Sequence, residues 1–479
     1  MAAAEDRLPV RNPRTGDNDY WITPPSPKRL HEICQELRAA QVAWGARPLA
    51  ERIAVMLRWA DAIERHAQAI GDAEAIDTGR WKLSHQVPHM VVDGIRGWCK
   101  SAPALIDRAL LSGTSTIYPN VSFQSQLKPI PLLGVISPWN HPFLLATLDA
   151  IPALIAGCAV VVKPSEIAPR FVEPVQRTVD DVPELAAVLR FITGDGRTGQ
   201  ALIEEVDALC FTGSVGTGRK VAVACANRFI PAFLEMGGKD AAVVTATADL
   251  DRAATAVLRS SVFATGQICF STERVYVHES VHDAFVQKLV EKSNQLELSY
   301  PDPRRGHIGP FTFVRQAAIV DAHIDDALAQ GARLACGGKS EQLGGGHYMR
   351  ATVLTEVTHA MKVMTEETFG PVTPVMRYRT EEEAIALAND SDYGLSAAVI
   401  AGDVEEARRI GERLDAGAVA LQDAGITIAI LRDAEKNSFN LSGMGGSRMG
   451  PNGLLRFYRK KALMANHAAP ADMLALGEA

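Results

Sequence analysis

The 479-residue chain lacks most patterns that mark a specialised class of protein. Its seven cysteines form an odd, scattered set without a CxxC pair or a Cys/His spacing typical of zinc. We therefore expect reduced thiols and no metal site. An excess of basic residues is also missing, because 56 acidic residues outnumber 49 basic ones and the formal net charge is −7. This balance gives no support for nucleic-acid binding.

Long apolar runs are absent as well. The most apolar stretch, residues 143–162, is interrupted by Asp149, Pro152 and Gly157, whereas a membrane-spanning helix needs about 20 consecutive apolar residues. Residues 1–7 carry acidic side chains and no apolar segment, so no secretory signal is expected. We expect a cytoplasmic protein without a membrane or nucleic-acid partner.

The chain does have the length and composition of a globular protein with more than one domain. Hydrophobic residues make up 47% and charged residues 22%, and the length exceeds one ordinary core. Apolar residues recur at helical spacing over residues 28–110, which predicts helices there.

From residue 132 onward, short apolar runs alternate with helical segments, which predicts a parallel α/β sheet. The expected strands of this sheet are residues 132–137, 158–163, 186–193 and 207–213, with one helix over residues 143–157. A second α/β unit is expected after residue 240. Because ligands bind beyond the carboxyl ends of such strands, the loops after Ser137, Lys163 and Thr212 are the expected binding region.

Cys269 is the first candidate for chemistry, in the segment GQICFS that follows a helical stretch. A lone cysteine is more often a buried structural residue than a nucleophile. A nucleophilic role requires an activating base and an oxyanion site elsewhere in the chain.

Two further residues can supply those functions. Glu235 follows the apolar strand FIPAFL and precedes two glycines; it forms a structural salt bridge or acts as a general base. Asn140 follows the first expected βαβ strand, where it either caps the next helix or donates an N–H to a developing oxyanion.

Together with their flanking residues, these three positions resemble the signature segments of the aldehyde dehydrogenase superfamily. The resemblance spans roughly residues 30–460 and keeps the order of the segments. It is carried by SPWN (137–140), KPSE (163–166), FTGSVGTGRK (211–220), LEMGGKD (234–240), GQICFSTERV (266–275) and EETFGPV (366–372).

The resemblance implies a role for each matching residue. Cys269 would attack the aldehyde carbon, Asn140 and the backbone N–H of Cys269 would hold the oxyanion, and Glu235 would activate the water that hydrolyses the thioester. NAD is the expected cofactor, because Glu166 would repel a 2′-phosphate, but Lys163 leaves NADP open. The matching cofactor positions are Trp139, Lys163, Ser165, Glu166, Gly213, Ser214, Gly237, Glu367 and Phe369.

The resemblance also implies an organisation in three parts. The fold class is α/β, with a Rossmann-type NAD-binding domain (residues 1–114 and 133–236) and an α/β catalytic domain (residues 237–449). A small β oligomerisation subdomain would contain residues 115–132 and 450–466. Exposed strand edges in such a subdomain tend to be covered by another chain, so a homodimer or homotetramer is expected.

Residues 420–450 depart from the family pattern, in which this region lines the substrate entrance. The chain has SFNLSGMGGSRMG (438–450) where many members carry a Gly-Gly-x-Lys-x-Ser-Gly-x-Gly run. Leu145, Leu148, Ile268 and Phe270 are candidate pocket residues or ordinary core residues. No Arg or Glu marks a partner for a charged substrate, and the GQICFSTER segment resembles aromatic aldehyde dehydrogenases. An aromatic or medium-chain apolar aldehyde is therefore expected.

Two alternatives stay open at this point. A CoA-acylating semialdehyde dehydrogenase of the same fold would resolve the thioester with CoA and typically lacks the general base. A non-catalytic scaffold would keep the fold without the chemistry. The presence of Glu235 argues against the first, and the joint presence of Cys269, Glu235 and Asn140 argues against the second.

Overall fold

The structure is a computed structural model that describes residues 7–476. Three long helices confirm the helical prediction for residues 28–110: α1 (Pro27–Ala46), α2 (Leu49–Thr78) and α3 (Trp81–Ala109). The Ser26 hydroxyl accepts from the backbone N–H of Arg29 and caps α1, and Gly79 ends α2 in the left-handed conformation. The three helices are preceded by a hairpin of β1 (Leu8–Arg11) and β2 (Asn18–Ile22), which the sequence analysis did not predict.

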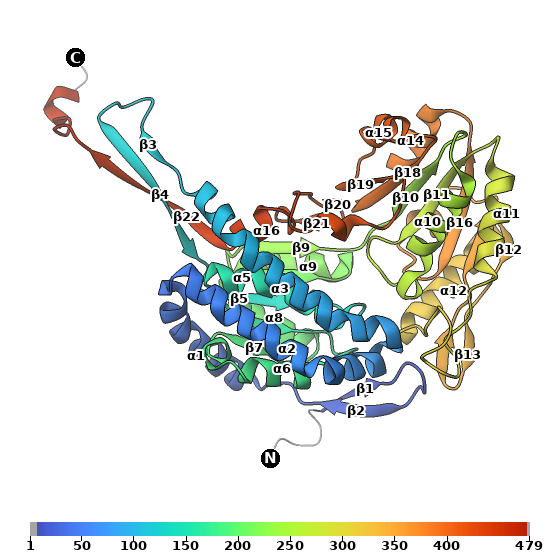
Figure 1. Cartoon of the computed structure of the whole chain (residues 1–479), viewed down its shortest axis with the longest axis horizontal. Helices are drawn as coiled ribbons and strands as arrows, with labels where there is room; N and C mark the ends of the chain where they lie inside the picture. The colour runs from blue at the N-terminus through green and yellow to red at the C-terminus, as the bar shows by residue number, and fades with distance from the viewer. Residues whose placement is uncertain (1–6, 477–479) are drawn as a thin grey trace.

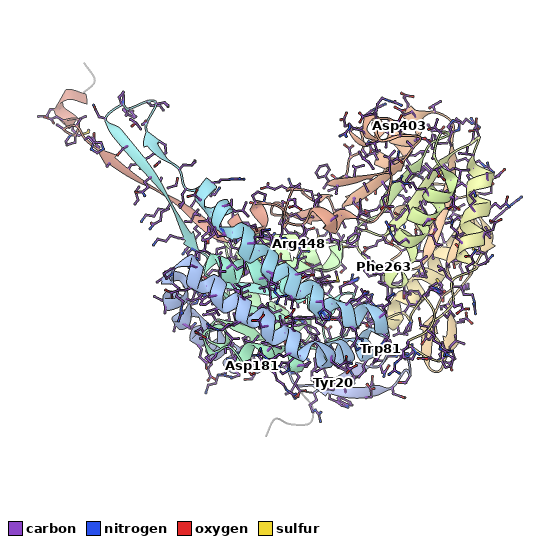
Figure 2. All side chains as sticks on the ribbon, viewed as in Figure 1. Tyr20, Trp81, Asp181, Phe263, Asp403 and Arg448 are labelled. Atoms are coloured by element: carbon purple, nitrogen blue, oxygen red, sulfur yellow. The ribbon has the colours of Figure 1, made fainter. Side chains whose placement is uncertain are left out.

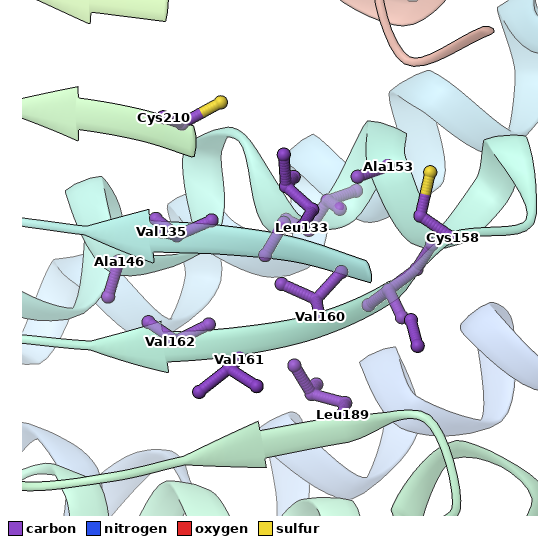
Figure 3. Packing of buried hydrophobic residues seen from close by; sticks show 14 of the residues in the cluster. Leu133, Val135, Ala146, Ala153, Cys158, Val160, Val161, Val162, Leu189 and Cys210 are labelled. Carbon is purple, nitrogen blue, oxygen red and sulfur yellow. The ribbon is translucent and has the colours of Figure 1, made fainter. Parts of the chain in front are cut away.

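The first large sheet has six strands in the order β21-β9-β8-β5-β6-β7. Its parallel strands are β5 (Leu132–Ile136), β6 (Ala159–Lys163), β7 (Leu189–Phe191), β8 (Ala208–Thr212) and β9 (Ala232–Glu235), and β21 (Gly443–Met444) adds an antiparallel edge. Figure 3 shows Val135, Val160 and Val162 of neighbouring strands packed in its core. Since β6 reads AVVVK and is buried along its length, it is covered on both faces.

Helices α4 to α9 surround this sheet (Figure 1). Their bounds are α4 (Pro142–Leu148), α5 (Ala150–Ala156), α6 (Val172–Asp180), α7 (Pro183–Ala186), α8 (Gly196–Glu205) and α9 (Val215–Asn227). The prediction of one helix over 143–157 was wrong, because the helix divides at Asp149. Pro152 cannot donate to the Leu148 carbonyl, and the buried Asp149 carboxylate pairs with Arg448 and Arg456.

The predicted strand over 186–193 was too long at both ends. Helix α7 extends to Ala186, so only Leu189–Phe191 pairs with β6. Of the apolar residues before Leu189, Ala186 ends α7, whereas Ala187 is exposed and Val188 is buried in the turn that follows; a short apolar run alone does not distinguish these states from a strand.

The second large sheet has seven strands in the order β12-β15-β16-β11-β10-β18-β19. The strands are β10 (Asp240–Val244), β11 (Thr272–His278), β12 (Arg333–Cys336), β15 (Thr352–Thr355), β16 (Val372–Tyr378), β18 (Ser396–Ile400) and β19 (Ala418–Leu421). All neighbours are parallel except β12 and β15. The helices of this part are α10 (Leu250–Val262), α11 (His282–Ser293), α12 (Val314–Ala329), α13 (Lys362–Thr365), α14 (Glu381–Asn389) and α15 (Val404–Gly411). The two sheets confirm the α/β fold class.

A third sheet projects from the body as an arm (Figure 1). It contains β3 (Ser112–Thr114), β4 (Val121–Pro129) and β22 (Tyr458–Asn466), and β22 pairs with β4 along its whole length. The tail segment LLRFYRKKALMA (454–465) has the pattern of a final strand, but the strand begins only at Tyr458, because Asn452–Leu455 forms the short helix α16. Among the helices of residues 7–476, none combines the length and hydropathy needed to span a membrane.

Candidate active site

The candidate residues lie where the two large sheets face one another. Asn140 follows β5, Glu235 ends β9 and Cys269 lies between the short 3-10 helix η2 (Phe263–Gly266) and β11. Figure 2 labels Phe263, the first residue of η2, on the side of the second sheet that faces the helical half. Three elements that are distant in the sequence therefore converge on one region.

The loop that carries Cys269 has an unusual backbone. Ala264, Thr265 and Gly266 all have positive φ, at 54°, 65° and 68°. A Cβ atom on Gly266 would overlap the backbone of Gly370, so this position requires glycine. The apolar pattern of residues 249–266 predicts one helix up to Gly266, and this prediction was wrong at its end, because α10 ends at Val262.

Hydrogen bonds hold this strained loop in place. The Thr265 hydroxyl donates to the Gly309 carbonyl at 3.2 Å, and the buried Gln267 side chain accepts from the backbone N–H of Thr312 at 3.1 Å. Strain of this kind persists only where the surroundings over-determine it, and it is concentrated at functional sites. The loop thus presents the half-buried Cys269 in a fixed place.

Asn140 reaches the same loop. Its side-chain Nδ2 donates to the Gln267 carbonyl at 2.9 Å, two residues before Cys269. A primary amide has two N–H donors, so one donor stays available for an oxyanion beside Cys269. The Arg80 guanidinium donates to the Asn140 carbonyl and holds the backbone of Asn140 in place.

Glu235 is buried at the carboxyl end of β9. Its Oε2 accepts from the Ser438 hydroxyl at 2.6 Å, and the Lys436 ammonium lies 3.9 Å from the same oxygen. The backbone of Glu235 is also held in place, because Gly213 N–H donates to the Glu235 carbonyl and β21 pairs with β9 at this residue.

Opposing effects act on the Cys269 thiol. Burial raises its pKa to about 12, and the positive charge of Lys436 opposes that rise. Asp240, Glu235 and Glu367 act in the same direction as burial, because like charges disfavour a thiolate. Lys436 is therefore the cation that favours the reactive form of this cysteine.

The adenosine side of the expected cofactor site begins at the end of β6. Lys163 is buried and donates to the carbonyls of Gly194 at 2.6 Å and Pro164 at 3.0 Å, and burial lowers its pKa. Its ammonium lies 3.8 Å from a carboxylate oxygen of the half-exposed Glu166. The Ser165 hydroxyl accepts from the backbone N–H of Ile167 and shapes this turn.

Gly213 and Ser214 precede helix α9. The Ser214 hydroxyl donates to Thr217 Oγ1 at 3.2 Å and does not cap the helix, so the first N–H groups of α9 have no side-chain cap. Free N–H groups at a helix N-terminus suit a pyrophosphate. A Cβ atom on Gly213 would crowd the Phe211 ring, so a larger residue does not fit.

The expected nicotinamide side of the site contains Glu367 and its neighbours. Burial, with the charge of Glu273, raises the pKa of Glu367 to about 8, and the carboxylate accepts from Gly238 N–H at 3.3 Å. A Cβ atom on Gly237 would overlap this carboxyl group. Phe369 has a φ of 54°, and its ring meets Trp139 edge-on at 5.5 Å. Gly237 leaves room for the Glu367 carboxylate, which can accept further hydrogen bonds, and Trp139 and Phe369 supply aromatic rings. These residues form a cradle that suits a ribose and a nicotinamide ring.

The expected pocket residues lie near these groups in the chain. Leu145 and Leu148 are half-buried on α4, the helix that follows Asn140, whereas Ile268 is buried and Phe270 is half-buried beside Cys269. Their contact with a substrate stays a prediction.

Sequence reasoning missed a buried ionic cluster behind the site. Lys239 donates to Glu273 at 2.7 Å and to the Thr368 hydroxyl at 2.9 Å, and Glu273 accepts from the backbone N–H groups of Thr368 and Phe369, each at 2.7 Å. This cluster fixes the loop that carries Glu367 and Phe369. The sequence does contain a signal for this cluster: Lys239 follows the two glycines after Glu235, and Glu273 lies near the start of β11, where a buried strand is expected.

The mostly parallel first sheet and the second α/β unit, which together hold Asn140, Glu235 and Cys269, have the architecture expected of a nicotinamide-dependent oxidoreductase with a separate catalytic unit. Residues 1–463 match the aldehyde dehydrogenase family, and the chain belongs to that family. The predicted family, fold and enzyme class, an oxidoreductase that acts on aldehydes, are therefore confirmed.

Relatives of several kinds share this fold. The chain is 34% identical over 444 residues to the 4,4′-diapolycopene aldehyde oxidase of Methylomonas sp, covering 90% of this chain and 80% of that protein. It is 34% identical to a protein of Mycolicibacterium smegmatis provisionally named succinate-semialdehyde dehydrogenase [NADP(+)], covering 98% and 90%. The solved structure of an aldehyde dehydrogenase provisionally named PutA from Anabaena variabilis has a TM-score of 0.94 and 48% identity, covering 97% and 99%. Betaine aldehyde dehydrogenase from Staphylococcus aureus in complex with NAD+ has a TM-score of 0.90 and 28% identity, covering 98% and 94%.

Proposed function

We propose that this chain oxidises an aldehyde to the carboxylic acid through a thiohemiacetal and then a thioester on Cys269. The observation that carries the proposal is the convergence of three groups on one loop. Asn140 donates to the carbonyl two residues before Cys269, and the buried Glu235 acts electrostatically on the thiol. A nucleophile, an oxyanion donor and a general base are the parts that acyl transfer requires.

The residues divide the chemistry into two stages. The Cys269 thiolate forms a bond to the aldehyde carbon, and the free N–H of Asn140 with the backbone N–H of Cys269 stabilises the oxyanion. One such donor typically contributes about 2.7–4 kcal/mol. When bound in the cradle, NAD(P)+ would accept the hydride from that carbon; the C–O− group then becomes C=O, which leaves a thioester on Cys269. Glu235 then takes a proton from water, the water oxygen attacks the thioester carbon, and the C–S bond breaks to release the acid and the thiolate.

The cofactor is proposed to be NAD in preference to NADP. The half-exposed Glu166 places a negative charge where the ribose hydroxyls are expected, and a 2′-phosphate would be repelled there. Lys163 offsets part of that charge from 3.8 Å. One relative carries NADP(+) in its name and one solved relative contains NAD+, so both cofactors occur among similar proteins.

Hydrolysis is favoured over transfer to CoA, because Glu235 is present and hydrogen-bonded beside the cysteine loop. The substrate is proposed to be an aromatic or medium-chain apolar aldehyde, on the basis of the apolar residues Leu145, Leu148, Ile268 and Phe270. One relative is named 4,4′-diapolycopene aldehyde oxidase and another succinate-semialdehyde dehydrogenase, so the names of similar proteins do not agree on one substrate.

The three-part organisation is proposed to follow residues 1–114 with 133–236, residues 237–449, and residues 115–132 with 450–466. One feature crosses the first boundary, since β21 of the catalytic range pairs with β9 of the first sheet. The arm of β3, β4 and β22 presents strand edges that a second copy of the chain would cover. A cytoplasmic homodimer or homotetramer is therefore proposed.

An aldehyde panel tests the proposal. Aromatic, aliphatic and semialdehyde substrates are compared by NADH formation in the wild type, Cys269→Ala and Glu235→Gln. We expect the highest kcat/KM for apolar aldehydes, no NADH from Cys269→Ala, and a burst followed by slow turnover from Glu235→Gln. Full activity of Cys269→Ala would overturn the covalent route.

A further inference from the structure

The segment that departs from the family pattern lies against the proposed base. Residues 436–444 are anchored on both sides: β20 (Phe439–Asn440) pairs with β17 (Tyr393–Gly394), and β21 pairs with β9 beside Glu235. The Ser442 carbonyl also accepts from Met236 N–H at 2.8 Å. Lys436 and Ser438 are thereby placed next to the Glu235 side chain by backbone pairing as well as by their own contacts.

Lys436, Ser438 and Glu235 form a directional chain of hydrogen bonds. The Lys436 ammonium donates to Ser438 Oγ at 3.0 Å, and Ser438 Oγ donates to Glu235 Oε2 at 2.6 Å. An ammonium has donors and no acceptor, so Ser438 must accept from Lys436 and its single proton points to Glu235. Ser438 therefore donates to Glu235 Oε2 and holds the carboxylate in one orientation, from which it can accept a proton as a general base.

The other carboxylate oxygen of Glu235 is left for chemistry. Within residues 7–476, no side chain or backbone N–H donates to Glu235 Oε1, whereas Oε2 is held by Ser438. The charged and titratable groups that face Glu235 are Lys436, the Cys269 thiol and Arg448, which is bound to Asp149 and to the Thr212 hydroxyl. Of these three groups, Lys436 is linked to Glu235 through an intervening hydroxyl, that of Ser438.

We propose that Lys436 and Ser438 are positioning residues that hold Glu235 oriented for thioester hydrolysis. The inference rests on the proposed function and deepens it by naming the groups that control deacylation. It also gives a physical role to the segment in which this chain differs from its family.

The test follows the decay of the acyl adduct on Cys269. Holoenzyme is mixed with an aldehyde and NAD+, quenched in acid at intervals and weighed by intact-protein mass spectrometry, with the NADH burst recorded in parallel. We expect Ser438→Ala to keep the burst and to slow adduct decay about tenfold, because a hydrogen bond to a charged group is lost. Lys436→Met should also slow decay, and Lys436→Arg should restore it, because a guanidinium is an always-charged donor.

Asn437→Ala is the matched control, since Asn437 lies between Lys436 and Ser438 with an exposed side chain. This control should show wild-type decay. Recovery of decay in Lys436→Arg, which keeps the charge and changes the shape of the side chain, is the readout that a merely structural role would not give.

The outcomes separate this inference from the function on which it rests. Slow decay in Glu235→Gln with wild-type decay in Ser438→Ala and Lys436→Met would overturn the positioning role alone. Wild-type decay in Glu235→Gln would overturn the proposed base itself. If Lys436→Met raises KM only for aldehydes that carry a carboxylate and leaves decay unchanged, Lys436 is a substrate anchor and the positioning role is wrong.

Discussion

The replacement Glu273→Gln tests whether the buried ionic cluster holds the cofactor loop. The glutamate and Lys239 have side chains that are 3% and 0% exposed, and the ion pair spans 2.7 Å. Both carboxylate oxygens accept from backbone N–H groups of the loop that carries Glu367 and Phe369. In glutamine, the NH2 group must face one of these donors, and the Lys239 ammonium loses its counter-charge.

The magnitude follows from this geometry. Removing one partner of a buried ion pair costs about 3–5 kcal/mol, and the lower value applies because the Thr368 hydroxyl still accepts from Lys239. A loss of about 3 kcal/mol lowers the unfolding midpoint by roughly 6–12 °C for a cooperative unit of 150–250 residues. Since the loosened loop carries Glu367 and Phe369, we also expect at least about tenfold weaker NAD+ binding, which corresponds to about 1.4 kcal/mol.

Calorimetry provides both readouts, thermal unfolding and NAD+ titration. Glu366→Gln is the matched control, because the side chain of Glu366 is 59% exposed and its contact with His323, at 3.5 Å, is one that a glutamine side chain can keep. We expect this control to change stability by less than about 0.5 kcal/mol. Equal midpoints and equal NAD+ affinities for the two variants would refute the role assigned to Glu273.

Three further predictions concern the site. Because burial raises the pKa of Glu367 to about 8, its acceptor form increases with pH, so NAD+ affinity by calorimetry should rise between about pH 6.5 and 9; a flat wild-type profile, or an equal rise in Glu367→Gln, contradicts this role. Lys436→Met should slow iodoacetamide alkylation of Cys269 about tenfold at fixed pH, because removal of the nearby cation raises the thiol pKa; an unchanged rate by mass spectrometry would show that its charge is irrelevant. Wild-type kcat/KM should favour NAD over NADP, and Glu166→Gln should raise relative NADP use about fivefold; a wild-type preference for NADP would reverse the interpretation of Glu166.

The parts of the fold that sequence predicted are those with strong periodicity. Helices α1 to α3 and strands β5, β6 and β8 follow their apolar patterns closely, because a buried strand or a helix face needs no distant partner to be recognised. The break at Asp149 was not predicted, although Pro152, which cannot donate to the Leu148 carbonyl, is visible in the sequence. The strand around β7 was predicted too long because one apolar run, residues 186–193, covers the end of α7, a turn and the strand.

The candidate site, like the fold, has parts that the sequence predicted and parts that it did not. Cys269, Glu235 and Asn140 could be named because each is flanked by a recognisable segment. The loop in front of Cys269 could not be predicted as left-handed, because Ala264 and Thr265 take that conformation only under the constraints of Gly309 and Thr312.

Lys436 was missed for a related reason. It lies in the segment without a family counterpart, and only the pairing of β21 with β9 brings that segment to Glu235. The expectation that no Arg or Glu marks a partner for a charged substrate stays a prediction, but it left out this buried lysine, whose ammonium acts on both Glu235 and Cys269.

The central claim is a thioester on Cys269 that Glu235 helps to hydrolyse. The most direct measurement is intact and peptide-level mass spectrometry of Glu235→Gln quenched in acid after one turnover with NAD+ and an apolar aldehyde. The account predicts an adduct on Cys269 with the mass of the aldehyde less two hydrogens, formed together with one NADH per site. NADH formation without an adduct, or an adduct on another residue, would contradict it.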